Sequence, residues 1–130
     1  PGQISFPGGS PDSGEDLADA ALREAQEEIG LDPEAVDLIG SLPPTPTFVS
    51  GFRVHSFVGL IEPAESWSTS EAEVAAVLEP SIRELRAGFA RRTVQTPRGD
   101  FTHGTYLLDA DTLIWGATAR IIGNLLAALP

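Results

Sequence analysis

The 130-residue chain contains no cysteine, no methionine and no lysine. Without cysteine it can form neither a disulfide nor a thiolate metal site, which fits a cytoplasmic protein. At this length we expect a single domain over residues 1–130. Because the chain has no methionine to start translation, we expect this domain to lack its natural N-terminus. The sequence also has no apolar run long enough to span a membrane and no charged-then-apolar leader. We therefore expect no membrane partner.

All eight basic residues are arginine, and 19 acidic residues leave a formal net charge of −11. A net charge of this sign repels polyphosphate backbones, so we expect no nucleic-acid partner. An acidic protein can still bind a small anionic molecule when metal ions bridge the two. The net charge is therefore compatible with a small anionic substrate.

Apolar periodicity and turn residues predict elements along the whole chain. The predicted strands before residue 80 span four segments: 3–6, 36–42, 52–61 and 74–78. The predicted helices span 16–29, 81–87 and 115–129. A hairpin is predicted from strands 91–96 and 101–108, with its turn at 97–100. Interspersed helices and strands indicate an α+β fold with a mixed β-sheet packed between helices.

Three carboxylates gather on one face of the first predicted helix. Residues three and four apart share a helix face, so Glu24, Glu27 and Glu28 should project together. Carboxylates this close repel one another, and helix stability gives little reason to gather them. A bound divalent cation would give a reason. The alternative is an ordinary solvated helix face.

The segment Gly9–Leu31 resembles the Nudix box, the signature of hydrolases that cut nucleoside diphosphates linked to another moiety. Gly9 is followed after five residues by Glu15. Seven residues later the other specified positions begin: Arg23, Glu24, Glu27, Glu28, Gly30 and Leu31. Ala25 is smaller than the usual aliphatic residue. The resemblance implies the Nudix fold, an α/β/α sandwich.

The resemblance also implies roles for the box residues. It implies a Mg²⁺ or Mn²⁺ cofactor with four ligands: Glu24, Glu27, Glu28 and the backbone carbonyl of Gly9. Glu24 could instead act as the general base, and Glu71 and Glu73 are further candidates for a catalytic carboxylate. Glu15 and Arg23 are expected to form a bidentate salt bridge that ties the loop to the helix. Their catalytic role is then positional.

Three stretches look like the coenzyme A pyrophosphatase subfamily: Gly2–Gly9, Gly51–Val54 and Ile114–Ile121. This resemblance implies cleavage of coenzyme A, or of its derivatives, to adenosine 3′,5′-bisphosphate and 4′-phosphopantetheine. The substrate carries a 3′-phosphate besides its diphosphate, so cations should line the site. The candidate substrate-binding residues are Arg53, Arg91, Arg92 and Arg98, and His55 and His103 are weaker candidates. Exposed arginines that only solvate the surface are the alternative.

The pantetheine arm would need an apolar groove. Candidate linings are Phe48, Phe52, Trp67 and Phe101, for which the protein core is the alternative place.

Two other functions stay open at this point. One is Nudix hydrolysis of another substrate, such as ADP-ribose, NADH or a nucleoside triphosphate. The other is a non-catalytic Nudix module that senses a nucleotide. A homodimer is the assembly that we consider for this chain.

Overall fold

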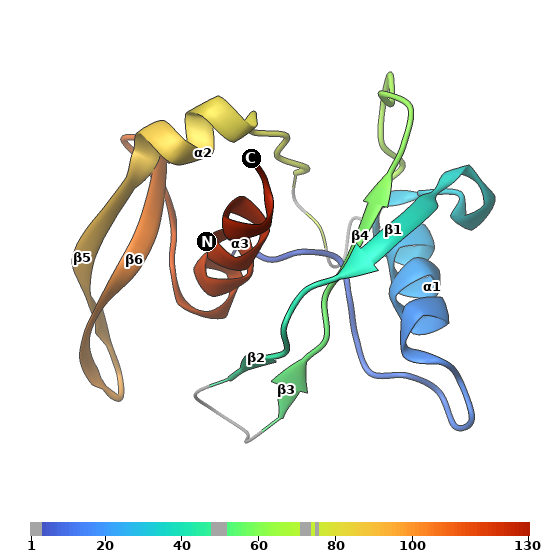
Figure 1. Cartoon of the computed structure of the whole chain (residues 1–130), viewed down its shortest axis with the longest axis horizontal. Helices are drawn as coiled ribbons and strands as arrows, with labels where there is room; N and C mark the ends of the chain where they lie inside the picture. Colours follow the sequence, from blue (N-terminus) through green and yellow to red (C-terminus); the bar gives the residue numbers. More distant parts are fainter. Residues whose placement is uncertain (1–3, 48–51, 71–73, 75) are drawn as a thin grey trace. The chain divides into compact units, whose positions relative to one another are not determined.

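The computed structural model of the chain describes residues 4–47, 52–70, 74 and 76–130 (Figure 1). Its strands form three separate antiparallel groups, two of two strands and one of three. Helices alternate with these strands along the chain. The predicted α+β fold class is therefore confirmed.

The chain divides into two compact units, each built from two separate stretches of sequence. The first unit combines Pro1–Leu42 with His55–Leu78, and the second combines Pro43–Val54 with Glu79–Pro130. The charged residues of the predicted Nudix box all belong to the first unit. One domain over residues 1–130 stays a prediction.

In the first unit, α1 (Leu17–Ile29) carries the charged half of the box. Most of its residues are strong helix formers, namely Ala, Leu, Glu, Gln and Arg. The helix begins after Asp16 and ends at Gly30, whose φ of 74° is left-handed. The Gly30 N–H donates to the carbonyl of Gln26 at 3.0 Å. Glycine adopts this conformation at little cost, so Gly30 forms the C-cap of α1.

A short 3₁₀ helix and one strand pair complete the first unit. The 3₁₀ helix η1 (Pro33–Ala35) follows the box in the sequence. Strand β1 (Asp37–Ser41) pairs antiparallel with β4 (Phe57–Leu60). The ladder shifts register between Leu38 and Gly40.

In the second unit, β5 (Phe89–Thr96), β6 (Gly99–Asp109) and β7 (Thr112–Ile114) form an antiparallel sheet. The β5–β6 hairpin is the one predicted, and its turn lies at Pro97 and Arg98. A two-stranded ladder, β2 (Thr45–Pro46) with β3 (Arg53–Val54), belongs to the same unit.

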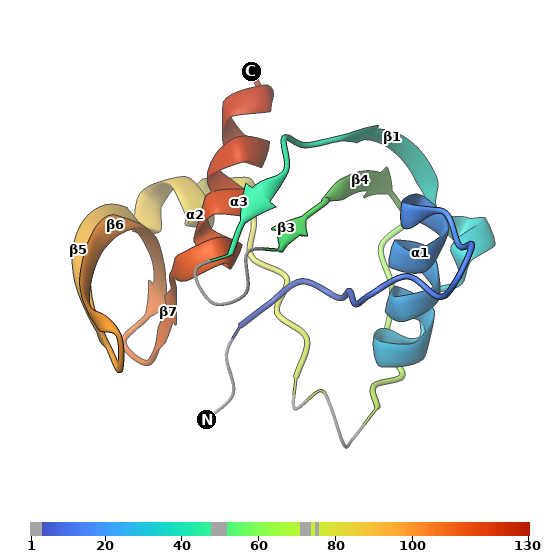
Figure 2. The ribbon, with the colours of Figure 1, turned by 90° about the horizontal axis from the view of Figure 1, so that it is seen from below.

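Two helices pack in the second unit. Helix α2 (Ile82–Gly88) starts with a capping box, in which the side chains of Ser81 and Glu84 each accept from the other's backbone N–H. Helix α3 (Gly116–Ala128) contacts β6 and lies on the concave side of the β5–β6 hairpin (Figures 1 and 2). The buried apolar side chains of this unit are Leu85, Tyr106, Ile114, Ala119, Ile121, Ile122 and Leu126.

Three strand predictions differ from the structure. Within the described residues, neither 4–6 nor 74 and 76–78 forms a strand. The predicted strand 52–61 is divided into β3 and β4, which pair with different partners, β2 and β1. An isolated extended segment must find backbone hydrogen bonds on a neighbour, and sequence pattern alone does not show where that neighbour lies. The short strands β2 and β7 were not predicted for the same reason.

Candidate active site

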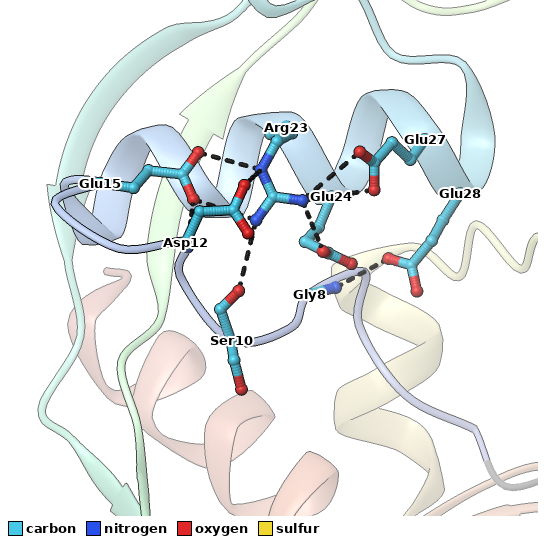
Figure 3. Close-up of polar contacts among 8 residues, drawn as sticks. All are labelled: Gly8, Ser10, Asp12, Glu15, Arg23, Glu24, Glu27 and Glu28. Carbon is cyan, nitrogen blue, oxygen red and sulfur yellow. Dashed lines mark hydrogen bonds and ion pairs between the residues drawn. The ribbon is translucent and has the colours of Figure 1, made fainter.

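Arg23 is the centre of the charged cluster on α1 (Figure 3). Its Nε donates to Oε2 of Glu15 at 2.9 Å, and its Nη2 donates to Oε1 of Glu15 at 3.0 Å. This bidentate pair is the geometry that a guanidinium makes with a carboxylate and an ammonium cannot. Because Glu15 lies on the loop before α1, the pair ties that loop to the helix.

The remaining edge of the guanidinium faces the helix carboxylates. Nη1 of Arg23 donates to Oε1 of Glu24 at 2.9 Å and to Oε2 of Glu27 at 3.3 Å. Asp12 adds an ion pair at 3.5 Å to Nε, and the backbone carbonyl of Ser10 accepts from Nη2 at 3.3 Å. One guanidinium thus contacts four carboxylates, and its bonds to the loop residues hold the loop in place.

These contacts change the protonation equilibria of the central pair. The hydrogen bonds of Arg23 to Glu15 and then to Glu24 raise the pKa of its guanidinium, so the side chain stays charged. The hydrogen bond from Arg23 and the backbone N–H of Asp12 lower the pKa of Glu15 below its ordinary value of 4.5. The Glu15 carboxylate is therefore ionised wherever the site works near neutral pH.

The glycines before the helix allow backbone to lie against the carboxylates. A Cβ atom at Gly9 would lie 2.7 Å from the carboxyl carbon of Glu24 and 2.8 Å from its Oε2. Real Cβ atoms essentially never lie this close, so any other residue at position 9 would displace the end of the Glu24 side chain. The neighbouring Gly8 N–H donates to Oε2 of Glu28 at 2.9 Å, an exposed bond that Figure 3 shows.

The C-terminal turn of α1 is held by a loop outside the box. The backbone N–H of Ser68 donates to the carbonyl of Ile29 at 3.2 Å, and that of Ser70 donates to the carbonyl of Glu28 at 3.0 Å. Helix-end carbonyls lack partners within the helix, so these bonds satisfy them. A Cβ atom at Gly30 would lie 2.8 Å from Cβ of Ser68, which makes glycine necessary here as well. Sequence reasoning missed this clamp, because backbone donors carry no residue signature.

The donor chemistry on this helix fits a hard divalent cation. Carboxylate oxygens are the ligands that Mg²⁺ and Mn²⁺ prefer. In the described part of the chain, no three His, Asp or Glu side chains already converge on one point as a metal site would require. Glu24 and Glu27 turn instead toward Arg23. The Glu27 side chain is 57% exposed and can rotate away, whereas that of Glu24 is 19% exposed.

The predicted substrate-binding arginines belong to the second unit. Arg53 lies exposed on β3, and Arg91 lies exposed on β5, where its Nη2 donates to the carbonyl of Thr102 at 3.4 Å. Arg98 lies exposed at the β5–β6 turn. Their substrate role therefore stays a prediction.

Other candidates have structural contacts or lie outside the described residues. Arg92 donates to the hydroxyl of Thr105 at 2.8 Å within the second unit. Nε2 of His103 accepts from the Gly116 N–H at 2.9 Å, at the start of α3. Phe52 is 73% exposed. Three candidates fall outside the described residues: Phe48, Glu71 and Glu73.

The family model for the Nudix domain matches residues 1–101. The chain belongs to the Nudix domain family. Among similar proteins is "Uncharacterized Nudix hydrolase NudL" of Citrobacter koseri, 45% identical over 127 residues that cover 95% of this chain and 65% of that protein. Proteins of the same name from Salmonella paratyphi B and Salmonella newport are 43% identical over the same shares. The chain thus spans less than two thirds of the length of these curated relatives.

The family match confirms the resemblance read from the Gly9–Leu31 spacing. The names of these relatives mention no substrate, so membership of the coenzyme A pyrophosphatase subfamily stays a prediction. None of the helices in the described part of the chain has the length and apolar character that a membrane crossing requires.

The lowered pKa of Glu15 predicts a pH-dependent contribution to stability. A carboxyl whose pKa is depressed on folding stabilises the fold above its unfolded value of 4.5, and this contribution disappears as the pH falls through the folded value. We expect Glu15→Gln to lower the free energy of unfolding at pH 7. The difference from the wild type should shrink steadily below pH 4.5.

Urea unfolding of both proteins across this pH range measures the effect. Glu34→Gln, an exposed acid on η1, is the matched control for the loss of one charge. An undiminished difference between wild type and Glu15→Gln at pH 3 would mean that the Glu15–Arg23 ion pair is not its source.

Proposed function

We propose that the chain hydrolyses a diphosphate bond as Nudix hydrolases do, and that its substrate is coenzyme A or a derivative of it. The observation that supports the reaction is the carboxylate cluster around Arg23, laid against the Gly8–Gly9 backbone. Structural stability alone gives no reason to set so many acids beside one another. A site that binds divalent cations next to an anionic diphosphate gives such a reason.

The cofactor in this proposal is Mg²⁺ or Mn²⁺, which would neutralise phosphate oxygens and acidify a water molecule. Glu24, Glu27 and Glu28 would hold it, together with the backbone carbonyl of Gly9. Glu27 reaches this arrangement by leaving Arg23, which its exposure allows. Arg23 keeps its bidentate bond to Glu15 meanwhile, so the loop stays in place.

The reaction transfers one phosphoryl group to water. The water oxygen bonds to phosphorus, the bond from phosphorus to the bridging oxygen breaks, and the leaving phosphate takes that electron pair. A carboxylate must accept the proton of the attacking water. Our choice among the described residues is Glu24, acting as the base instead of as a metal ligand, because its half-buried carboxylate lies against the Gly9 backbone. Glu71 and Glu73 remain alternatives.

The coenzyme A assignment is supported by sequence outside the box. Gly2–Gly9, Gly51–Val54 and Ile114–Ile121 resemble coenzyme A pyrophosphatases. Arg53 and Arg91 are exposed, and the resemblance to these enzymes makes them candidates for binding the 3′-phosphate. Arg98 is the third such candidate.

A substrate panel tests the proposal. Coenzyme A, ADP-ribose, NADH and a nucleoside triphosphate are incubated separately with the purified chain and Mg²⁺ or Mn²⁺, and products are separated by chromatography. We expect the highest kcat/KM for coenzyme A, with adenosine 3′,5′-bisphosphate as a product. Faster cleavage of ADP-ribose would overturn the substrate but keep the reaction. No cleavage of any of the four would favour a nucleotide-sensing module.

The close approach at Gly9 predicts a sharp difference between two neighbouring glycines. Gly9→Ala would push Glu24 aside, and a displacement of about 1 Å in a catalytic group costs on the order of 100-fold in rate. Gly8→Ala is the matched control, because a Cβ atom at Gly8 meets nothing within 4 Å and its N–H is kept. Steady-state kinetics on the best substrate should show a loss for Gly9→Ala alone. Equal rates for the two variants would refute the role given to this contact.

The metal assignment predicts a binding defect for Glu28→Gln. Glutamine keeps an oxygen that can accept the Gly8 N–H, so the loop contact survives while the charge is lost. We expect Mn²⁺ affinity to fall by about 100-fold or more. Electron paramagnetic resonance of added Mn²⁺ measures this without substrate, and Glu34→Gln on η1 serves as the control. Unchanged Mn²⁺ binding by Glu28→Gln would remove Glu28 from the ligand set.

A further inference from the structure

A cavity of about 340 Å³ lies in the first unit, next to the end of α1. Its apolar lining consists of Gly30, Leu31, Ala35, Ile61, Ala64 and Trp67, and its polar lining of Asp32, Glu62 and Ser66. The volume equals that of about ten water molecules in the liquid. None of the charged box residues is among this described lining. The cavity therefore shares no residue with the candidate metal ligands, although Trp67 was also a candidate for the groove of the pantetheine arm.

Backbone hydrogen bonds hold the walls of this cavity in place. On one side, the Ser68 and Ser70 N–H groups bind the last carbonyls of α1, which anchors the loop that carries Trp67. On the other side, Oδ1 of Asp32 accepts from the Glu34 N–H at 3.0 Å and fixes the start of η1. A preformed pocket spends little binding free energy on ordering its own walls.

The charge of the lining selects the sign of the occupant. The last carbonyls of α1 already accept from backbone N–H groups, among them those of Ser68 and Ser70, so the charge of the pocket comes from its side chains. Asp32 and Glu62 contribute two carboxylates, and none of the described lining residues is basic. The lining also includes the indole of Trp67, and indole attracts cations more strongly than the other aromatic side chains. The two carboxylates disfavour an anion.

We propose that this cavity binds a small organic cation of the alkylammonium class. The apolar lining accommodates the alkyl groups, while Trp67, Asp32 and Glu62 stabilise the positive charge. A strongly hydrated metal ion would gain nothing from the apolar walls. This inference assigns Trp67 to the cation instead of to the pantetheine arm, and it uses no residue of the metal-binding set.

The experiment compares two ligands of equal shape and different charge. Choline carries a trimethylammonium group, and its neutral isostere, 3,3-dimethylbutan-1-ol, carries a tert-butyl group in the same place. Each is titrated into the ¹⁵N-labelled chain, and the indole N–H signals are followed by NMR. The chain has two tryptophans, so Trp115 at the start of α3 serves as an internal control. Trp67→Phe identifies the signal.

We expect choline to shift the Trp67 signal in a saturable way and to leave Trp115 unchanged. The neutral alcohol should bind more weakly, and added salt should weaken choline binding. Equal affinity for the two ligands would overturn the proposal, since the cavity would then select shape alone. Equal shifts at both tryptophans, or none at Trp67, would overturn it as well.

Matched variants test the carboxylates. Glu62→Gln should weaken choline binding by about two- to five-fold, the range of a partly exposed ion pair. Glu65→Gln removes the same charge from the same loop outside the described lining, and should leave the affinity unchanged. Asp32→Asn keeps an oxygen that can accept the Glu34 N–H, and should weaken binding to a similar extent. Equal effects of Glu62→Gln and Glu65→Gln would reduce the interaction to net charge and refute a specific site.

Discussion

Four acidic side chains depend on one guanidinium, that of Arg23. It binds Glu15 through two parallel hydrogen bonds and Glu24 and Glu27 through its other edge, with Asp12 close by. Carboxylates at this separation disfavour one another's ionised forms unless a cation stands among them. The contacts of Arg23 therefore hold the loop before α1 in place. They also bring the loop backbone close to the helix face.

The sequence predicted local structure better than distant contacts. The bounds of α1 and its end at Gly30 were predictable, because helix propensity and a left-handed glycine act within a few residues. The Glu15–Arg23 pair was predictable from the family spacing. The predicted strand 52–61 was wrong as one element, because the partners of its two halves are set by chain segments far from it.

The site divides into a fixed part and an adjustable part. Glu24 is half-buried, bound to Arg23 and pressed against the Gly9 backbone, so its carboxylate has little freedom. Glu27 is exposed and held by longer hydrogen bonds to the same guanidinium. Under the proposed function these two carboxylates would act differently. Glu24 would set the geometry of the metal site, and Glu27 would exchange its ion pair with Arg23 for the divalent cation.

The clamp on the end of α1 has a consequence for how these sequences can vary. Ser68 and Ser70 contribute their backbone N–H groups, which every amino acid except proline possesses. Selection on this contact would leave almost no trace in residue identity, apart from a bar on proline and a small residue facing Gly30. The helix that carries the box is therefore held by contacts that depend little on side-chain identity, and a motif search along the chain would pass over that loop.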